Sequence, residues 1–191
     1  MAYPKITVNT GLAREIIASD TIPIPAPDLP VLSGTTTAAT ANKLVDVGAD
    51  FSNVNVNDIV YNTTDNTSAT VTAIDTETIL SVSADIFTSP EDYEIFLGGP
   101  NGSSRINSAE GCLLYVGSNA SIVQDIQPTN PVAPGVGSAD PRYVNIRVKT
   151  ISGNSVTFEN FPVGNYLPIQ IVQLYSTSTT AAARNTCVAI W

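Results

Sequence analysis

The chain has 191 residues, of which only 13% are charged, and it carries a net charge of −9 with no histidine. Without histidine the protein lacks the commonest general base and the commonest metal ligand. Its eight Lys and Arg residues are spread over the whole chain, whereas phosphate binding needs them clustered. We therefore expect no enzymatic activity, no cofactor, no metal site and no nucleic-acid partner.

The composition predicts an all-β fold, because Ser, Thr, Asn, Gly and Pro are plentiful and β-branched residues and Tyr outnumber good helix formers. Residues 1–20 show no apolar run of signal-peptide length, and no stretch approaches about 18 apolar residues. We expect a soluble product, made in the cytoplasm, with no membrane partner. Cys112 and Cys187 lie far apart in apolar stretches, which favours buried reduced thiols over a disulfide or a metal pair.

Residues 1–33 are expected to form an N-terminal arm. The segment 12–19, LAREIIAS, is compatible with a short helical turn or a strand, but four prolines at 23, 25, 27 and 30 exclude a helix and a central strand beyond it. The arm also carries aliphatic residues that need a surface, either its own sandwich or a neighbouring subunit. These residues are Ile22, Ile24, Leu29, Val31 and Leu32. The alternative is a disordered linker, although such linkers are usually poor in large aliphatics.

Residues 34–97 are typical of a compact unit of about four or five short strands. NTTDNTS, at 62–68, is a polar turn between two strands, and Val71 and Ala73 alternate with threonines in the second strand. A further strand is predicted to place Leu80, Val82, Ala84 and Ile86 on one face. The last strand is predicted to align Tyr93, Ile95 and Leu97. This pattern predicts a small barrel or sandwich.

The charges divide unevenly along the chain. Residues 34–97 contain ten acids and one base, which gives −9, while the remainder holds seven of each and is neutral. A domain of one sign stays solvated and repels its copies, whereas a neutral domain packs against partners at little desolvation cost. We interpret 34–97 as an outward-facing module and the rest as the docking part. The alternative is that the acidity only keeps a small domain soluble.

Residues 98–191 are predicted to form a second β domain. CLLYV, at 112–116, is an apolar strand, and RYVNIRVKT, at 142–150, alternates with Val144, Ile146 and Val148 on one face. A Pro/Gly-rich loop at 127–141 is long enough to indicate a functional or interface loop. The chain ends in CVAIW, and we expect this segment to form the last strand, with Trp191 in a core or interface pocket.

Three carboxylates near one strand, Glu91, Asp92 and Glu94, are candidates for glycoside hydrolysis, but solvated acids in a loop before an edge strand explain them as well. DFSNVNVND, at 50–58, contains a ladder of Asp and Asn but lacks the central Gly and closing Glu of an EF-hand. Only an irregular Ca²⁺ site stays open there.

The C-terminal half contains a series of short apolar and turn motifs, at Leu113–Gly117, Phe158–Gly164, Leu167 and Pro168, Ser176–Ala181 and Ala189–Trp191. In these segments the chain resembles the spike-base proteins of tailed-phage heads and of gene transfer agents. About half of the chain takes part in this resemblance. The chain departs from the pattern at loop 127–141 and at Ser178, where the pattern usually has Gly.

Residues 42–96 are similar to a separate small β module that recurs in structural proteins of phages and marine viruses. Its position between the arm and the strand at 112–116 is that of a domain inserted into the spike-base fold. The expected organisation is therefore an arm at 1–33 that belongs to the platform, an inserted acidic module at 34–97 and a β-sandwich, jelly-roll-like platform at 98–191. The inserted module would be a small β-barrel or sandwich.

The resemblance implies a virion protein that decorates the outer capsid surface as a spike-base subunit, made in the host cytoplasm. Implied partners are the major capsid protein, further copies in a pentamer or trimer, and a spike or fibre protein. The expected interface residues are Ile22, Ile24, Leu29, Val132, Val136 and Trp191. Two alternatives remain, a tail or baseplate adaptor or tail-fibre domain, and a carbohydrate-binding module. The candidate sugar-stacking residues, Tyr61, Tyr93 and Tyr166, are expected in the core or an interface instead.

Overall fold

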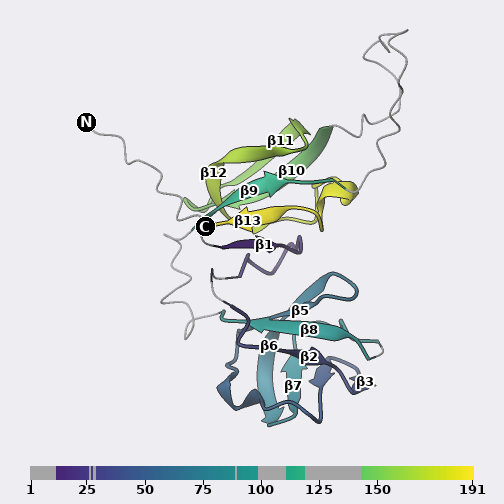
Figure 1. Cartoon of the computed structure of the whole chain (residues 1–191). Helices are drawn as coiled ribbons and strands as arrows, with labels where there is room; N and C mark the ends of the chain where they lie inside the picture. Colours follow the sequence, from purple (N-terminus) through teal and green to yellow (C-terminus); the bar gives the residue numbers. More distant parts are fainter. Residues whose placement is uncertain (1–11, 26, 28, 89, 99–110, 119–142) are drawn as a thin grey trace, which may run out of the picture.

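The computed structural model describes residues 12–25, 27, 29–88, 90–98, 111–118 and 143–191. In these residues nearly all of the regular structure is β: 50% of them lie in strands and 4% in helix. The strands form two antiparallel sheets, which lie one beyond the other along the molecule (Figure 1). The predicted all-β fold, of the β-sandwich class, is confirmed, and one of the two sheets curls into a half-barrel. The chain starts in one sheet, builds the other and then returns to the first.

We call the six-stranded sheet the terminal sheet, because its strands come from both ends of the described chain; their order is β1-β13-β9-β12-β10-β11. Its strands are β1 (Ala13–Glu15), β9 (Cys112–Val116), β10 (Tyr143–Thr150), β11 (Ser155–Pro162), β12 (Asn165–Leu174) and β13 (Val188–Ile190). The predicted alternation of β10 is confirmed, since Val144, Ile146 and Val148 are buried and the polar residues between them are not.

The last residues of the chain are part of this sheet, as predicted. β13 lies between β1 and β9, and Ala189 is fully buried. The amide of Trp191 donates a 3.1 Å hydrogen bond to the carbonyl of Leu12. Its ring packs against the core of the terminal sheet. Hydrogen bonding on both sides of a strand removes the free edge at which a chain end would otherwise fray.

We call the seven-stranded sheet the inserted sheet; the order of its strands is β2-β8-β5-β6-β7-β4-β3. Its strands are β2 (Leu32–Thr35), β3 (Ala38–Thr40), β4 (Lys43–Val45), β5 (Ile59–Asn62), β6 (Thr67–Thr76), β7 (Ile79–Val82) and β8 (Asp92–Phe96). Its two edge strands, β2 and β3, are consecutive in the chain and joined only by Thr36 and Thr37. The amide of Thr36 bonds to Glu91 and that of Thr37 to Val45, so the sheet must bend back upon itself.

The core of the inserted sheet contains a buried polar pair, Tyr93 and Asp46. Tyr93 is 1% exposed, and its hydroxyl donates a 2.9 Å hydrogen bond to Oδ2 of Asp46. Gly34 lies directly against this pair, since a Cβ atom built there would be 2.7 Å from the Tyr93 hydroxyl and 2.8 Å from Asp46 Oδ2. Glycine is required at this position because any side chain would meet the two bonded groups.

The structure corrects several details predicted for residues 34–97. The inserted sheet has seven strands, because β3 and β4 are three residues each and too short to show an alternation. The alternation in β6 holds to Val71, beyond which two irregularities leave Ile74 44% exposed. β7 ends at Val82, so Ala84 is exposed, and Leu97 lies just past the end of β8. Segment 12–19 forms a strand, β1, and no helical turn.

Candidate functional site at the junction of the two sheets

The arm joins the two sheets as a layer of its own. Between β1 and β2 it contains no strand in its described residues, as the prolines predicted. Four backbone amides of the arm donate hydrogen bonds to carbonyls of the C-terminal part of the chain. The pairs, donor first, are Ile16 with Cys187, Ala18 with Arg184, Ser19 with Leu174 and Ile24 with Val172. The arm therefore lies on the terminal sheet of its own chain.

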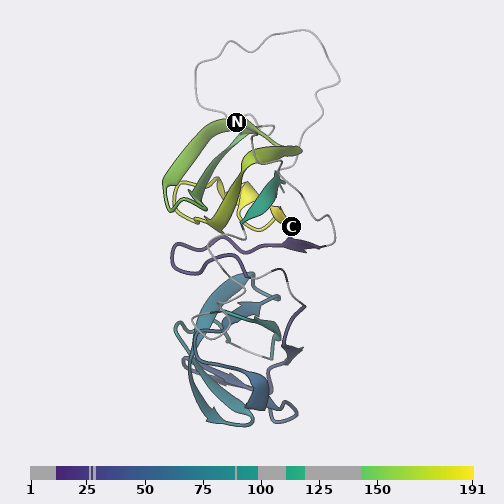
Figure 2. The same cartoon turned by 90° about the vertical axis from the view of Figure 1, so that its left-hand side faces the viewer.

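Isoleucines of the arm divide between two cores. Ile16 and Ile24, 0% and 6% exposed, belong to the core of the terminal sheet. Ile22 is 6% exposed and, with the partly buried Ile17, packs on a cluster of Ile59, Tyr61 and Phe96. That cluster lies on β5 and the end of β8, so the arm covers the inserted sheet as well (Figure 2). Burying large aliphatics on both sides holds the two sheets against one layer.

A polar contact fixes the bend of the arm. Both carboxylate oxygens of Asp20 accept hydrogen bonds from the turn after β12. The distances are 2.6 Å from Thr177 Oγ1, 2.9 Å from the Thr177 amide and 2.8 Å from Ser176 Oγ. The bonds from Thr177 hold the pKa of Asp20 below its ordinary value of 3.8, because they favour the charged form.

The two sheets also meet through Arg14 on β1. Its guanidinium carbon lies 3.9 Å from the centre of the Phe96 ring on β8. A guanidinium over an aromatic face is attracted by the electrons of the ring. The contact is therefore a second tie between the sheets, independent of the isoleucines.

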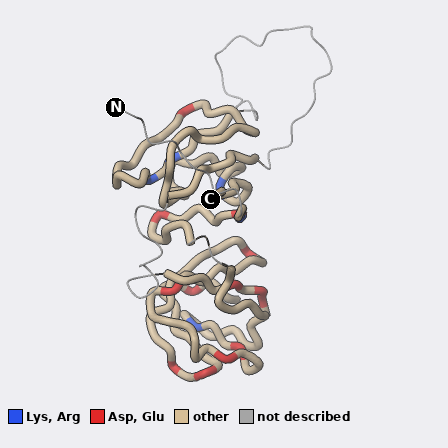
Figure 3. The backbone as a smooth tube through the Cα atoms, turned by 60° about the vertical axis from the view of Figure 1, so that its left-hand side comes forward, with Lys and Arg blue, Asp and Glu red and all other residues tan. Residues whose placement is uncertain are grey.

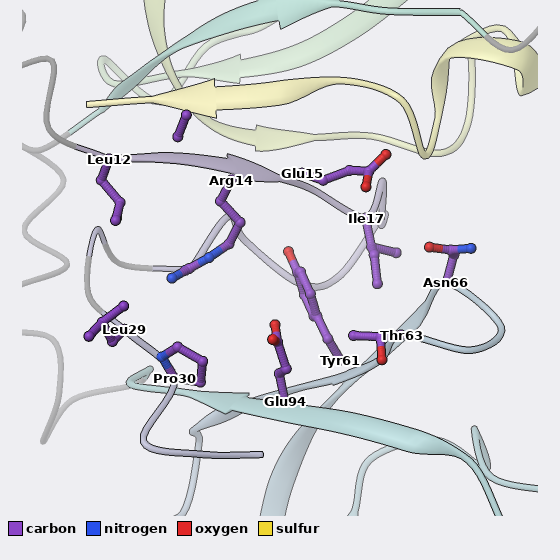
Figure 4. Close-up of a pocket in the computed structure, with 11 residues that line it drawn as sticks. Leu12, Arg14, Glu15, Ile17, Leu29, Pro30, Tyr61, Thr63, Asn66 and Glu94 are labelled. Carbon is purple, nitrogen blue, oxygen red and sulfur yellow. The ribbon is translucent and has the colours of Figure 1, made fainter. Parts of the chain in front are cut away.

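Beside this contact is a pocket of about 430 Å³, with β1 on one side and β5 and β8 on the other (Figure 4). The described residues that line it are Leu12, Ala13, Arg14, Glu15, Ile17, Leu29, Pro30, Tyr61, Thr63, Asn66 and Glu94. Clefts where two layers meet are the usual place for ligand sites. Sequence reasoning had not identified this pocket, because its walls come from segments far apart in the chain.

Tyr61 is the most unusual group in the pocket. It is 3% exposed, yet its hydroxyl has no hydrogen-bond partner within the described residues. Burial raises the pKa of Tyr61 above its ordinary value. The Ile17 backbone and the positive charge of Arg14 lower this pKa, but by less than burial raises it. In Figure 4 the hydroxyl points toward β1, between Arg14 and Ile17. A buried polar group without a partner is rare in native structures, and this one belongs to a residue that lines the pocket.

The negative charge gathers on the inserted sheet (Figure 3). Its one base, Lys43, pairs with Asp75 at 2.8 Å. Three of its acids are buried and bonded within the fold: Asp46 to Tyr93, Asp58 to the amides of Asn55 and Gly98, and Glu91 to Asn62. Desolvation raises the pKa of Asp58 above 3.8. The negative electrostatic field around the inserted sheet therefore comes from its acids other than these three.

The expected interface residues lie in different environments. Ile22 and Ile24 contact this same chain, Leu29 is 77% exposed beside the pocket, and Trp191 is half-buried on the terminal sheet. Val132, Val136 and the loop 127–141 lie outside the described residues. Contacts of these residues with another subunit stay a prediction.

The three candidate carboxylates are not brought together. Glu91 bonds to Asn62 and the Thr88 amide, Asp92 accepts from Thr35 at 2.6 Å, and Glu94 lines the pocket. Strand β8 lies between β2 and β5, so it is not the edge strand that the sequence suggested. Among the described residues, no three acids, cysteines or histidines gather in a way that could hold a metal ion.

The Asp/Asn ladder at 50–58 has local bonding roles. Asp50 caps the short 3₁₀ helix η1 (Phe51–Asn53) by accepting from the Ser52 amide. Asp58 accepts from the Asn55 amide at 2.8 Å. Both bonds close turns, which is a common use of Asp in irregular backbone.

The two cysteines are free and buried, as predicted. Burial raises the pKa of Cys112 to about 12 and that of Cys187 to about 11, so neither thiol ionises readily at neutral pH. In the described part of the chain no helix is long and apolar enough to cross a membrane.

Of the three tyrosines considered for sugar stacking, Tyr61 and Tyr93 are buried as predicted, whereas Tyr166 is 58% exposed. Tyr166 packs edge-on against Tyr115, with ring centres 5.3 Å apart. Comparison of the chain with protein families, with curated proteins and with solved structures finds no match. The functional conclusion therefore depends on the geometry described above and on the resemblance in the sequence.

Proposed function

We propose that the chain is a structural virion protein of a tailed phage, which binds the outer capsid through the terminal sheet and displays the inserted sheet in solvent. The observation that carries this proposal is the partition of charge between the two sheets. The whole net charge of −9 belongs to residues 34–97, and these residues form nearly all of the inserted sheet. A neutral sheet docks at a low desolvation cost, while an acidic one stays hydrated.

The outward face of the terminal sheet supports the same assignment. The strand register aligns Val188, Tyr115 and Tyr166 in one row, and Leu113 with Ile190 in the next. These side chains lie opposite the core face that contains Leu114, Ala189 and Leu167. All five are at least partly exposed, and Tyr is enriched in protein interfaces. This face is the surface that we assign to capsid contact.

The junction supports a role in projection. The arm is hydrogen-bonded to the terminal sheet and buries Ile22 against the inserted one, and Arg14 adds its contact with Phe96. Apolar burial together with a cation–π contact resists bending better than a flexible linker does. The inserted sheet is therefore held away from the capsid, where it stays in solvent or holds a fibre.

The test is to localise the protein on intact particles by cryo-electron microscopy, with an antibody fragment against the inserted sheet as a marker. We expect density on the head, with the terminal sheet against the shell and the antibody outward. Density on the tail would instead select the alternative of a baseplate adaptor or fibre domain. Density with the inserted sheet against the shell would contradict the proposal.

Binding to purified capsids tests the surface itself. Tyr115→Ser with Tyr166→Ser removes the aromatic pair and should abolish retention of the protein by sedimented capsids. The matched control is Glu77→Gln with Asp85→Asn, two exposed acids of the inserted sheet, which should leave retention unchanged. The opposite pattern would show that the acidic sheet is the docking part. Light scattering of the free protein measures the expected trimer or pentamer.

A further inference from the structure

The pocket at the junction contains several polar side chains, and among the described residues the hydroxyl of one of them, Tyr61, has no hydrogen-bond partner. Tyr61 and Glu94 are directly opposite each other in the register of β5 and β8, so both project from the same face of the inserted sheet. The Tyr61 hydroxyl is buried and has no partner, and Glu94 is half-buried. Asn66 and Thr63 lie on the turn that follows β5, at one end of the pocket (Figure 4). A hydroxyl, a carboxylate and an amide thus line the same small volume.

Apolar groups close other parts of the pocket. Leu12 and Ile17 come from the side of β1, and Leu29 with Pro30 from the end of the arm. Leu29 is 77% exposed, which is unusual for so large an aliphatic side chain. The described wall therefore combines apolar side chains with polar and charged ones, and polar groups placed among apolar ones fix the orientation of a small ligand. A ligand that covers Leu29 would bury this surface.

The charges of the pocket indicate the class of ligand. Arg14 supplies one positive charge and lies over Phe96, while Glu15 and Glu94 supply two negative ones. Phosphate or another polyanion would be repelled by the two carboxylates. A ligand with many hydroxyl groups and no net charge suits this lining, because its hydroxyls donate to Glu94 and accept from Tyr61.

We propose that this pocket binds one sugar residue of a neutral glycan. The hydroxyl of Tyr61 and the carboxylate of Glu94 bond to adjacent hydroxyls of the sugar, and its apolar side packs against Leu29. Since the ligand contacts the arm at Leu29 and the inserted sheet at Tyr61 and Glu94, its binding also ties the arm to this sheet. The proposal depends on the pocket alone and is independent of the virion role.

The test uses the full chain labelled with ¹⁵N, titrated with glucose, galactose, mannose and N-acetylglucosamine and followed by amide chemical shifts. We expect at least one sugar to shift the amides of Tyr61, Asn66 and Glu94 in a saturable manner. Tyr61→Phe and Glu94→Gln should each weaken binding at least about tenfold, in line with loss of a hydrogen bond to a buried or charged group. Tyr61→Phe should not lower the melting temperature, since the hydroxyl that it removes has no partner in the free protein.

Two variants serve as matched controls. Tyr143→Phe removes an exposed hydroxyl on β10, and Glu159→Gln removes an exposed carboxylate on β11; both should bind the sugar as the parent does. The proposal is overturned if none of the four sugars shifts these amides, or if Tyr61→Phe and Glu94→Gln bind as well as the controls. The free amino acid glycine is the comparison ligand. If glycine shifts the amides of the pocket and none of the sugars does, the pocket binds zwitterions and the proposal is contradicted. Capsid retention measures the virion role separately.

Discussion

The guanidinium carbon of Arg14 lies 3.9 Å from the centre of the Phe96 ring, so a residue of the terminal sheet is in contact with the outer face of the inserted sheet. The contact joins two bodies whose own cores are separate. It gives the junction a directional interaction in addition to the non-directional packing of isoleucines.

We expect Arg14→Ala and Phe96→Leu to be coupled in a double-mutant cycle. The coupling energy should be about 0.5–1 kcal/mol, the value typical of a partly exposed cation–π pair. Urea unfolding of the four proteins measures it. Arg147 over the Tyr175 ring, at 4.6 Å within the terminal sheet, is the matched pair for comparison. Strict additivity of Arg14→Ala and Phe96→Leu would show that the contact does not contribute to stability.

The arm should be separable into two functions by single substitutions. Ile24→Ala removes a buried side chain from the core of the terminal sheet and should cost about 2–4 kcal/mol of unfolding free energy. Ile22→Ala should loosen the junction while both sheets stay folded, which small-angle scattering and limited proteolysis would detect. Leu29→Ser is the control, because Leu29 is 77% exposed and its loss should leave stability unchanged. If all three substitutions change stability and the junction equally, the arm does not act as a layer that packs on both sheets.

Asp20 should give the protein a stability that disappears in acid. Its pKa is lowered in the folded state by the bonds from Thr177. Its contribution is therefore present above the ordinary carboxyl value of 3.8 and is lost as the pH falls through the lower folded value. Asp20→Asn should destabilise by about 1 kcal/mol near neutral pH, a figure reduced for solvent exposure. Urea unfolding across this pH range should show the parent and the variant converging in acid; a constant difference would exclude the linkage.

Ser178 is a site where a glycine should stabilise the protein. Its φ is +66°, in the left-handed region that a residue with a Cβ occupies at a cost of about 1 kcal/mol. Ser178→Gly should therefore raise the unfolding free energy by up to about 0.5 kcal/mol, after the greater entropy of unfolded glycine is subtracted. Gly153→Ala is the opposite test, because φ there is +87° and no atom lies within 4 Å of the added Cβ. Thermal unfolding should show opposite signs for the two substitutions.

Gly34→Ala should disrupt the Tyr93–Asp46 pair, since the added methyl would lie 2.7 Å from the Tyr93 hydroxyl. We expect a loss of about 2–3 kcal/mol from overpacking in the core. Tyr93→Phe should cost about 1–3 kcal/mol, because it removes the donor to Oδ2 of the buried Asp46 and leaves only the bond from the Gly48 amide to Oδ1. Combined, the two changes should cost less than their sum, because removal of the hydroxyl relieves the shortest contact of the added methyl, although those with Asp46 Oδ2 at 2.8 Å and with the ring carbon Cζ at 2.9 Å stay. A fully additive result in urea unfolding would argue against contact at this point.

Much of the fold could be read from local patterns. Alternation in β10 predicted its buried face, the polar turn at 62–68 placed β5 and β6, and the prolines of the arm excluded strands there. Each of these features depends on neighbours in the chain, where backbone geometry and side-chain period act directly. The apolar chain end likewise predicted that β13 lies within a sheet.

What only the tertiary structure decided is which distant residues meet. Ile17 and Ile22 show the same aliphatic character as Ile16 and Ile24, yet they face a different core, because the arm turns between the sheets. Nothing near Arg14 in the chain points to Phe96, and nothing near Tyr61 shows that its hydroxyl is buried without a partner. Local propensity sets the strands, but contacts between remote segments depend on how the whole chain closes, and the pocket is formed by such contacts.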